Sequence, residues 1–246
     1  MHQNDKHPIL EVQNLIKVYG GKAVVNGLSF NVGKGEVIGL LGPNGAGKTT
    51  AFYMTIGLIR PDSGKVFFKG KETTFLPIHE RAHMGMGYLA QEPSVFRHLT
   101  VEENILCILE TLPITKAERQ ARLEALLREL HLEKLAKKKA SSLSGGERRR
   151  LEITRALVTE PSLLLLDEPF ANIDPIAVAD VKKMIRHLKN RGISILITDH
   201  NAREIFSIAC RSYLIREGKI LISGTVQQLL QSREARQTYF GEDFKI

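Results

Sequence analysis

The stretch GPNGAGKTT, residues 42–50, constrains this chain more than any other, because it requires a particular strand–loop–helix unit. It matches the pattern G-x-x-x-x-G-K-[ST] in full, directly after the apolar run EVIGLLG and before a segment typical of a helix. Its glycines let backbone N–H groups turn toward phosphate oxygens, and the helix start adds positive potential. We therefore predict a nucleotide phosphate-binding loop formed by Gly42, Pro43, Asn44, Gly45, Ala46, Gly47, Lys48, Thr49 and Thr50.

Two acidic residues follow a second apolar strand, LLLL at 163–166. Asp167 comes at the carboxyl end of this strand, where ligands of α/β sheets bind, and its carboxylate can hold Mg²⁺. Glu168 is placed to polarise an attacking water. In the phosphate loop, Lys48 can bridge the β- and γ-phosphates of ATP, and the Thr49 hydroxyl can join the Mg²⁺ site. The alternatives are that residues 42–50 form a glycine-rich turn without a ligand and that Asp167 and Glu168 are a surface acid pair. Because both motifs directly follow apolar strands, we favour a site for ATP and Mg²⁺.

Apolar strands alternate with helical segments through most of the chain, which is typical of a parallel α/β core. Residues 9–36 instead mix two-residue alternation with Gly-Gly and Gly-Lys-Gly turns, and they predict antiparallel strands. Residues 100–140 have helical spacing and predict a helical insertion. Its leucines at 123, 126, 127 and 130 share one helix face, and we interpret this stripe as core packing rather than a partner-binding surface.

Charge and cysteine content narrow the class of protein. A formal net charge of +8 over 246 residues permits nucleic acid, anionic lipid headgroups or nucleotides as partners. Cys107 and Cys210 are too far apart to indicate a zinc site or a disulfide framework, and we expect both to be buried. No stretch approaches the roughly 20 apolar residues that span a bilayer, and MHQNDKHPIL at the start lacks the apolar segment of a secretory signal. Any membrane function would require other chains to cross the bilayer.

The segment LSGGE, residues 143–147, resembles the signature motif of ATP-binding-cassette (ABC) proteins. It stands between the helical insertion and the acidic strand, which is the order of that family, and the resemblance covers almost the whole chain. It implies an α/β P-loop NTPase (ABC ATPase) fold in a single domain over 1–246. Its expected parts are a RecA-like core with an N-terminal antiparallel β subdomain over about 1–95 and 160–235, a helical subdomain over about 96–159 and a tail over about 235–246.

The same resemblance implies an ATP-dependent homodimer. A helix start is an anion site, and in this family the signature of one subunit caps the γ-phosphate that the other subunit holds. Here the matching residues are Ser144, Gly145, Gly146 and Glu147. Asp174, in FANIDP, resembles the aspartate of the loop that crosses the dimer interface. Two ATP molecules would join two subunits, and hydrolysis would let them open.

Three more residues match family positions around the phosphate loop. Tyr19 resembles the aromatic residue that stacks on adenine, and His200 resembles the switch histidine that reaches the γ-phosphate. Gln91 resembles the glutamine that joins Thr49 and Asp167 around Mg²⁺ and links the site to the helical insertion. A lone tyrosine or histidine is usually structural, so the interpretation depends on the order and spacing of these residues relative to the motifs.

Within the ABC proteins, the sequence resembles most closely the ATPase subunits of lipopolysaccharide-export transporters. The resemblance is carried by GMGYLAQEPSVFRHLTVEENI, LLLLDEPFANIDPIAVADV, ITDHNAREIFSIACRSYLI and the ending YFGEDFKI. It implies a cytoplasmic protein, peripheral on the inner membrane, that works with two transmembrane subunits in separate chains. Ala90 stands where many relatives carry proline, and Asn172 where glycine is more frequent, although asparagine tolerates left-handed backbone better than most residues.

The groove after Gln91 is the expected docking site for the transmembrane partners, because Phe96 and Arg97 offer an aromatic–arginine anchor. The alternative is that Phe96 packs into the core of the insertion. Two other functions stay open: the ATPase of a branched-chain amino-acid importer, and a soluble cassette ATPase acting on nucleic acid or ribosomes. The second usually has two cassettes or a long coiled-coil insertion, so we expect no nucleic-acid partner and interpret the arginines at 148–150 as helical ion-pairing residues.

Overall fold

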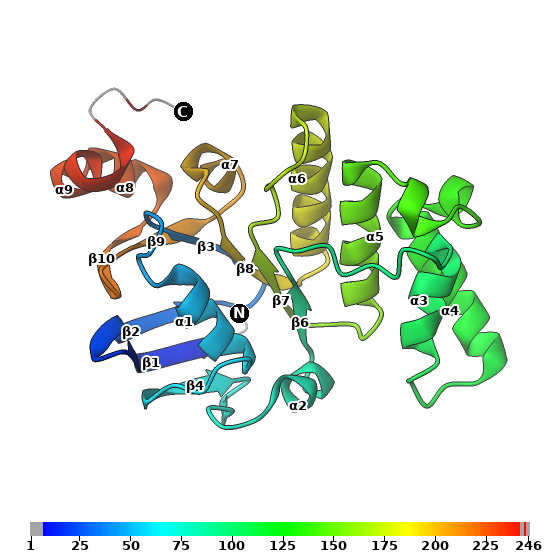
Figure 1. Ribbon diagram of the computed structural model, residues 1–246, viewed down its shortest axis with the longest axis horizontal. Helices are drawn as coiled ribbons and strands as arrows, with labels where there is room; N and C mark the ends of the chain where they lie inside the picture. The colour runs from blue at the N-terminus through cyan, green and yellow to red at the C-terminus, as the bar shows by residue number, and fades with distance from the viewer. Residues whose placement is uncertain (1–6, 242–243, 245–246) are drawn as a thin grey trace, which may run out of the picture.

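The computed structural model describes residues 7–241 and 244, and it contains two sheets with helices around them (Figure 1). Residues 1–6, 242–243 and 245–246, which include part of the expected tail, lie outside the described residues. The first sheet is antiparallel and has the strand order β2-β1-β4-β5. Its strands are β1 (Leu10–Tyr19), β2 (Lys22–Val32), β4 (Ser63–Phe68) and β5 (Lys71–Glu72). This sheet confirms the antiparallel strands predicted before the phosphate loop.

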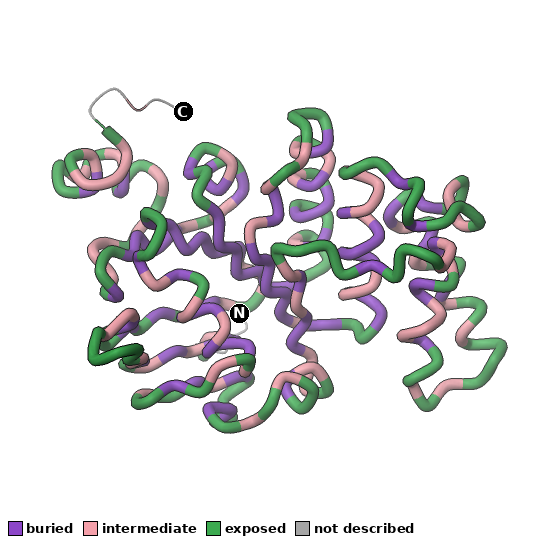
Figure 2. The backbone as a smooth tube through the Cα atoms, viewed as in Figure 1, coloured by how far each residue is buried: buried purple, intermediate pink, exposed green. Residues whose placement is uncertain are grey.

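The second sheet has the order β10-β9-β3-β8-β7-β6, parallel except for the last hairpin of the chain. Its strands are β3 (Val37–Leu41), β6 (Met86–Leu89), β7 (Leu163–Asp167), β8 (Ser194–Thr198), β9 (Arg211–Arg216) and β10 (Lys219–Gly224). Every residue of β3, β7 and β8 is buried, since helices cover both faces of the central strands (Figure 2). These strands therefore form a fixed base for the loops at their carboxyl ends.

Helices pack on both faces of the parallel sheet and form two apolar clusters with it. One cluster includes Phe52 and Met54 of α1, and the other includes Val181 and Ile185 of α6. The helices of this part of the chain are α1 (Lys48–Ile56), α2 (Ile78–His83), α6 (Pro175–Asn190), α7 (Ala202–Phe206), α8 (Val226–Gln231) and α9 (Arg233–Ala235), followed by the π-helical turn η3 (Arg236–Phe240). Strands and helices alternate as the sequence predicted.

A third apolar cluster lies among the helices between β6 and β7. These are α3 (Val101–Leu109), α4 (Lys116–Glu129) and α5 (Gly145–Leu157), with the short turns η1 (Glu133–Leu135) and η2 (Ala140–Ser142). Leu123, Leu127 and Leu130 are buried, and Leu126 packs between this cluster and the one around α6. The leucine stripe is therefore core packing, as predicted, and the helices form a separate layer at one end of the molecule (Figure 1).

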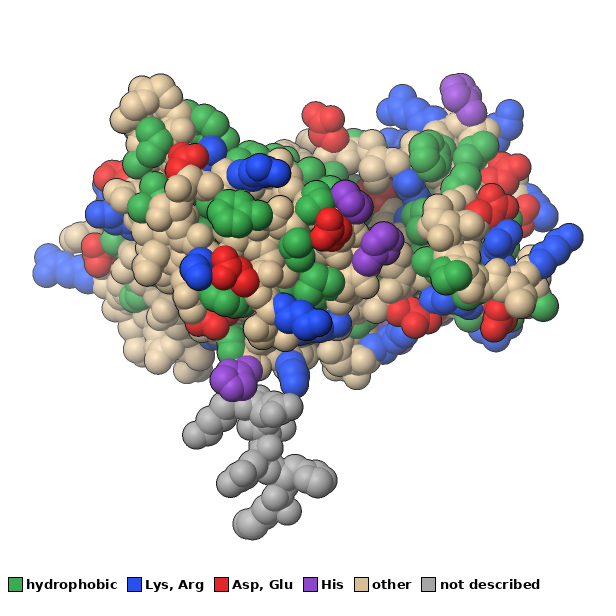
Figure 3. Space-filling view, turned by 90° about the horizontal axis from the view of Figure 1, so that it is seen from below, with side chains coloured by type: hydrophobic (Ala, Val, Ile, Leu, Met, Phe, Trp, Pro, Cys, Tyr) green, Lys and Arg blue, Asp and Glu red, His purple; other side chains and the backbone are tan. Residues whose placement is uncertain are grey.

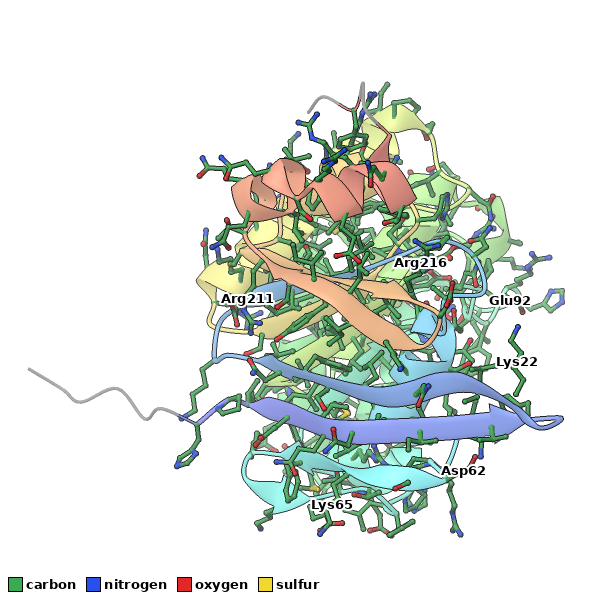
Figure 4. All side chains as sticks on the ribbon, turned by 90° about the vertical axis from the view of Figure 1, so that its left-hand side faces the viewer. Lys22, Asp62, Lys65, Glu92, Arg211 and Arg216 are labelled. Atoms are coloured by element: carbon green, nitrogen blue, oxygen red, sulfur yellow. The ribbon has the colours of Figure 1, made fainter. Side chains whose placement is uncertain are left out.

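Polar contacts at the start of β9 tie the two sheets together. Arg211, labelled in Figure 4 at the opposite end of β9 from Arg216, donates to Glu36 at 2.8 Å and to the Asn31 side chain at 2.7 Å. Because Asn31 belongs to β2, this arginine fixes the antiparallel sheet against the parallel one. The neighbouring Cys210 is exposed and Cys107 of α3 is half-buried, so the expectation that both cysteines are buried was wrong. Cys210 lies just before β9 rather than inside the strand.

The surface and the helix lengths bear on possible partners. Within residues 7–241 and 244, none of the helices combines the length and apolar character that a bilayer crossing requires. On the face seen in Figure 3, basic and acidic side chains are interspersed. Nucleic-acid-binding surfaces instead concentrate lysine and arginine in a stripe or patch. On this face, lysine and arginine side chains are therefore spread out among acidic ones and do not form a continuous basic patch.

Candidate active site

The phosphate loop joins the end of β3 to the start of α1, where the sequence predicted it. Gly42 and Gly47 have φ values of 152° and 97°, which other residues rarely adopt. A Cβ atom at Gly42 would lie 2.3 Å from the Ile215 carbonyl oxygen, and one at Gly47 would lie 2.4 Å from the Val24 carbonyl oxygen. Glycine is therefore required at both positions by conformation and by space. Pro43, Asn44 and Gly45 at the tip of the loop are exposed, so their backbone is open to a ligand.

Lys48 is buried beneath this loop, and its ammonium group bends back onto the backbone. Its Nζ donates to the carbonyl oxygens of Gly42 at 2.7 Å and Pro43 at 2.9 Å. Burial lowers the pKa of Lys48, and three nearby carboxylates, Glu168 foremost, oppose that shift. The positive charge is thus held directly under the loop, where phosphate oxygens could replace the carbonyls as acceptors. Thr49 beside it is exposed and Thr50 is half-buried at the helix start.

Asp167, the last residue of β7, is almost fully buried. Its Oδ1 accepts from the Thr198 hydroxyl at 2.6 Å, while its Oδ2 is buried without a hydrogen-bond partner among the described residues. Burial raises the pKa of this carboxyl above its usual value, partly offset by Thr198 and, more weakly, by the nearby Tyr53 hydroxyl. A buried oxygen without a partner is costly unless a ligand satisfies it.

Three loops at the ends of β6, β7 and β8 bring their side chains together beside Asp167. The side chains are those of Gln91, Glu168 and His200. The Gln91 side chain donates to Glu168 Oε2 at 3.0 Å, and His200 Nδ1 lies 3.5 Å from the same oxygen. Glu168 has φ 43°, a left-handed conformation that is uncommon outside glycine and that concentrates at functional sites. The structure thus brings together three residues that are 77 and 32 positions apart in the chain.

Tyr19 lies at the end of β1, at the turn of the first hairpin, with 49% of its surface exposed. The Lys17 ammonium group lies 5.5 Å from its ring centroid. The following strand contacts the loop, because the backbone of Val24 lies against Gly47. Tyr19 is therefore an exposed aromatic ring on the hairpin that borders the phosphate loop.

The signature residues lie at the start of α5, away from the phosphate loop of the same chain. Ser144 accepts from the Glu147 backbone N–H at 3.2 Å, and the Glu147 side chain accepts from the Ser144 N–H at 2.8 Å. This reciprocal cap fixes the first turn, with Gly145 and Gly146 inside it. Figure 1 shows α5 on the far side of β6 and β7 from α1. Within one chain, the start of α5 and the phosphate loop therefore lie apart.

Asp174 and Asn172 shape the loop between β7 and α6. Asp174 caps α6 by accepting from the N–H groups of Ile176 and Ala177, both at 3.0 Å. Asn172 has φ 58°, a left-handed conformation that asparagine tolerates better than most other residues. Ile176 beside them has 79% of its surface exposed, which is unusual for a large aliphatic residue. Asp174 therefore fixes the end of the loop to the first turn of α6, and that turn presents an apolar side chain to solvent.

Phe96 and Arg97 lie on the segment between Gln91 and α3, and both are exposed. Half of the Phe96 surface, 51%, is accessible, so its packing into the core of the insertion is excluded. The Arg155 guanidinium lies 4.9 Å from the Phe96 ring centroid, and Asn104 bonds both the N–H and the carbonyl of Phe96. The ring is held in place while one face stays open. Ala90, just before Gln91, is half-buried and its carbonyl accepts from Arg149.

Sequence reasoning missed the part played by Arg149. Its guanidinium is buried, pairs with Glu152 at 2.9 Å, and donates to the carbonyls of Ala90, Pro169, Asp167 and Glu168 at 2.9–3.3 Å. It thus connects the signature helix to the backbone on both sides of the acidic pair. In the sequence it is one of three adjacent arginines, and only the helical phase could have set it apart: Arg149, but neither Arg148 nor Arg150, is buried.

Comparisons with known proteins agree with this geometry. Residues 25–171 match the family described as ABC transporter. The lipopolysaccharide export system ATP-binding protein LptB of Acidithiobacillus ferridurans is 54% identical over 97% of this chain and 99% of its own length. The protein of the same name from Escherichia coli K12 is 46% identical over 96% and 99%. A nucleotide-free ATP-binding cassette from an ABC transporter is 30% identical with a TM-score of 0.85, covering 96% of this chain and 100% of that one.

The likeness to solved structures extends to a nucleotide-bound state. The ADP conformation of an ATP-binding cassette of an ABC transporter has a TM-score of 0.86 at 30% identity, again over 96% and 100% of the two chains. The predicted α/β cassette fold, with its antiparallel sheet and helical layer, is thereby confirmed. The chain belongs to the ABC transporter family and is one of its ATPase cassettes.

Proposed function

We propose that this cassette powers lipopolysaccharide export, with the ATP site and the roles of its residues as follows. Tyr19 stacks on adenine, and the backbone from Gly42 to Thr50 holds the phosphates together with Lys48. The buried charge of Lys48 and the exposed loop tip support this assignment. Glu168 accepts a proton from the attacking water, and His200 donates a hydrogen bond to the γ-phosphate.

The residues present fit a Mg²⁺ ion bound together with a nucleotide. No cluster of three or more His, Cys, Asp or Glu suited to a metal occurs in the described part of the chain, so a site made wholly of protein carboxylates is not expected there. Mg²⁺ instead prefers one or two carboxylates plus substrate phosphates. The unsatisfied Oδ2 of Asp167, the Thr49 hydroxyl and the Gln91 side-chain oxygen are the ligands we assign. When bound, the ion would neutralise charge on the phosphate oxygens.

The ATP site is completed by a second copy of the chain. Ser144, Gly145, Gly146 and Glu147 would cap the γ-phosphate held by the partner subunit, and Asp174 would lie at the seam between them. Two observations support this: a reciprocal cap fixes the first turn of α5, where a helix start favours an anion, and this turn lies apart from the phosphate loop of its own chain. The exposed Ile176 beside Asp174 offers apolar surface for the same contact.

Two transmembrane subunits in separate chains would receive the movement of this dimer. We assign their docking site to Phe96 and Arg97, since the held but open Phe96 ring is the kind of anchor that binds a small partner segment. The cassette would then lie on the cytoplasmic face of the inner membrane. Within it, the division into a core over about 1–95 and 160–235, a helical part over about 96–159 and a tail is also our proposal.

The cargo assignment rests on one observation, the identity of 46–54% over nearly the full length of proteins named for lipopolysaccharide export. Affinity purification from detergent-solubilised inner membranes should yield the cassette with transmembrane proteins. In proteoliposomes, that complex should release lipopolysaccharide only with ATP. A complex that instead accumulates branched-chain amino acids would overturn the cargo, and capture of RNA without membrane proteins would overturn the transporter assignment.

The catalytic assignment is tested by Lys48→Ala. Removing the ammonium group should weaken ATP binding by at least tenfold and lower ATPase activity in parallel, because charge-assisted phosphate contacts are lost. Lys34→Ala, on the turn before β3 and outside the loop, is the matched control and should bind ATP as the wild type does. Equal ATP affinity of Lys48→Ala and wild type in a fluorescent-nucleotide titration would contradict the role of Lys48.

A further inference from the structure

The backbone of His200 is held by a residue from the far end of the chain. The Tyr239 hydroxyl, on the turn η3, donates to the His200 carbonyl oxygen at 3.1 Å. The two residues are 39 positions apart, and none of the nucleotide-binding motifs includes a residue near 239. This hydrogen bond restrains the backbone of residues 199–201, the loop between β8 and α7 that we call the switch loop. It therefore limits where the imidazole of His200 can lie.

The same hydroxyl group also reaches the phosphate loop. The Gly42 backbone amide and the Asp199 carboxylate are both close enough to the Tyr239 hydroxyl to affect its pKa. Burial raises the pKa of Tyr239 to about 12, so the phenol stays protonated and remains a donor throughout the physiological pH range. Tyr239 therefore bonds the loop that carries His200 and lies near the first glycine of the phosphate loop.

The segment that carries Tyr239 packs against α7, the helix that follows His200. Phe240 packs on Phe206 of α7 with ring centroids 5.4 Å apart, and the Arg203 guanidinium lies 5.4 Å from the Phe244 ring centroid. Figures 1 and 4 show the C-terminal helices lying over β9 and β10, next to α7. Because Ala235 just before η3 is fully buried, the start of the segment is anchored in the core.

His200 has few other restraints. Its side chain is 59% exposed, and its Nδ1 lies 3.5 Å from Glu168 and 3.6 Å from Asp199, too far for strong hydrogen bonds. Asp199 holds the turn locally by accepting from the Asn201 N–H at 2.8 Å. The contact that links the His200 backbone to a different part of the fold is the one from Tyr239.

We propose that Tyr239 is a positioning residue for ATP hydrolysis, which fixes the switch loop relative to the phosphate loop so that His200 can reach the γ-phosphate. The inference rests on the proposed roles of His200 and the phosphate loop. Its consequence is that the C-terminal segment sets the rate of hydrolysis without contacting the nucleotide. Losing one hydrogen bond that orients a catalytic group should lower kcat by roughly three- to tenfold.

The test is Tyr239→Phe in the full-length chain, which removes the hydroxyl and keeps the ring. We expect kcat for ATP to fall three- to tenfold, with the KM for ATP within twofold of wild type and an unchanged melting temperature. Thr238→Ala is the matched control, because its hydroxyl bonds only within the segment, to the Glu234 carbonyl at 2.7 Å. It should leave kcat unchanged.

A double-mutant cycle with His200→Ala separates positioning from a general effect on stability. If Tyr239 acts through His200, the second substitution should lower the single-turnover rate no further in the His200→Ala background. Additive losses, or a normal kcat in Tyr239→Phe, would overturn the inference. A normal kcat in His200→Ala itself, or a wild type that does not hydrolyse ATP, would instead overturn the proposed function, so the two failures are distinguishable.

Discussion

At the scale of single residues, the site is a small volume in which buried charges of opposite sign are only partly satisfied. Burial lowers the pKa of Lys48 and raises the pKa of Asp167 and Asp199, so each group pays desolvation that a nucleotide and its metal would relieve. Asp167 and Asp199 each keep a buried oxygen without a partner among the described residues. Unpartnered buried charges lower the stability of the ligand-free protein, and a ligand that satisfies them binds more tightly for that reason.

Asp167→Asn tests this reading. Because burial raises the folded-state pKa of Asp167, the folded chain binds that proton more tightly than the unfolded chain, and its stability rises as pH falls through that pKa toward the unfolded-state value. The neutral amide should therefore raise the melting temperature at pH 7 without ligand and remove this pH dependence. ATPase activity should fall at least tenfold, because the metal loses a charged ligand.

Asp62→Asn is the control of opposite sign. The pKa of Asp62 is lowered, mainly by its hydrogen bond to Lys17, so its carboxylate is favoured in the fold. The amide there should slightly lower the melting temperature and leave ATPase activity unchanged, as it lies on the β1–β4 surface. Thermal melts of Asp167→Asn that show lost stability at pH 7 would contradict the account of a strained acid.

At the scale of elements, α5 joins the two halves of the site. Its first turn carries the signature, and one turn later Arg149 holds the backbone around Asp167 and Glu168 and the carbonyl before Gln91. A movement of α5 would therefore shift the backbone on either side of Glu168 and the residue before Gln91. If a second subunit contacts the first turn of α5, as we propose, the contact would be transmitted to both residues.

Arg149→Met and Arg150→Met measure this difference on neighbouring residues. The first removes the guanidinium partner of the buried Glu152, which keeps a hydrogen bond from the Ser94 N–H, and should destabilise the fold by about 3–5 kcal/mol, with a strong loss of ATPase activity. Arg150 is partly exposed, and its guanidinium lies 3.6 Å from the Asp180 carboxylate, which is long for an ion pair. Its substitution should therefore lower the free energy of unfolding by less than about 1 kcal/mol. Urea titrations in which the two variants unfold at the same midpoint would argue against a special part for Arg149.

Elements with a strong local pattern could be predicted from the sequence. The apolar runs at β3, β7 and β8 and the leucine stripe of α4 each specify burial, so their place in the fold follows from periodicity. Arg149 and Tyr239 could not be found in this way, because their partners are backbone carbonyls brought near by tertiary structure. For Cys210 the residue type misled the prediction. Cysteine is usually buried, but this one is exposed just before the start of β9.

At the scale of the whole molecule, one chain carries two separate parts of the site that we propose. The phosphate loop, Glu168 and His200 lie on the parallel sheet, and the capped start of α5 lies apart from them on the helical layer. Head-to-tail pairing of two copies would satisfy both sites at once and leave two equivalent ATP sites. ATP binding would then drive closure of the dimer, and hydrolysis would release it to act on the membrane partners.

Glu168→Gln tests this account most directly, by gel filtration with light scattering in the presence and absence of ATP and Mg²⁺. The amide keeps the shape of the carboxylate but cannot accept the proton of water, so ATP should bind and persist. We predict a dimer with ATP, a monomer without it, and hydrolysis at least 100-fold slower than wild type. Adding Lys48→Ala should abolish the dimer. A Glu168→Gln chain that stays monomeric with ATP and hydrolyses it at the wild-type rate would contradict the account.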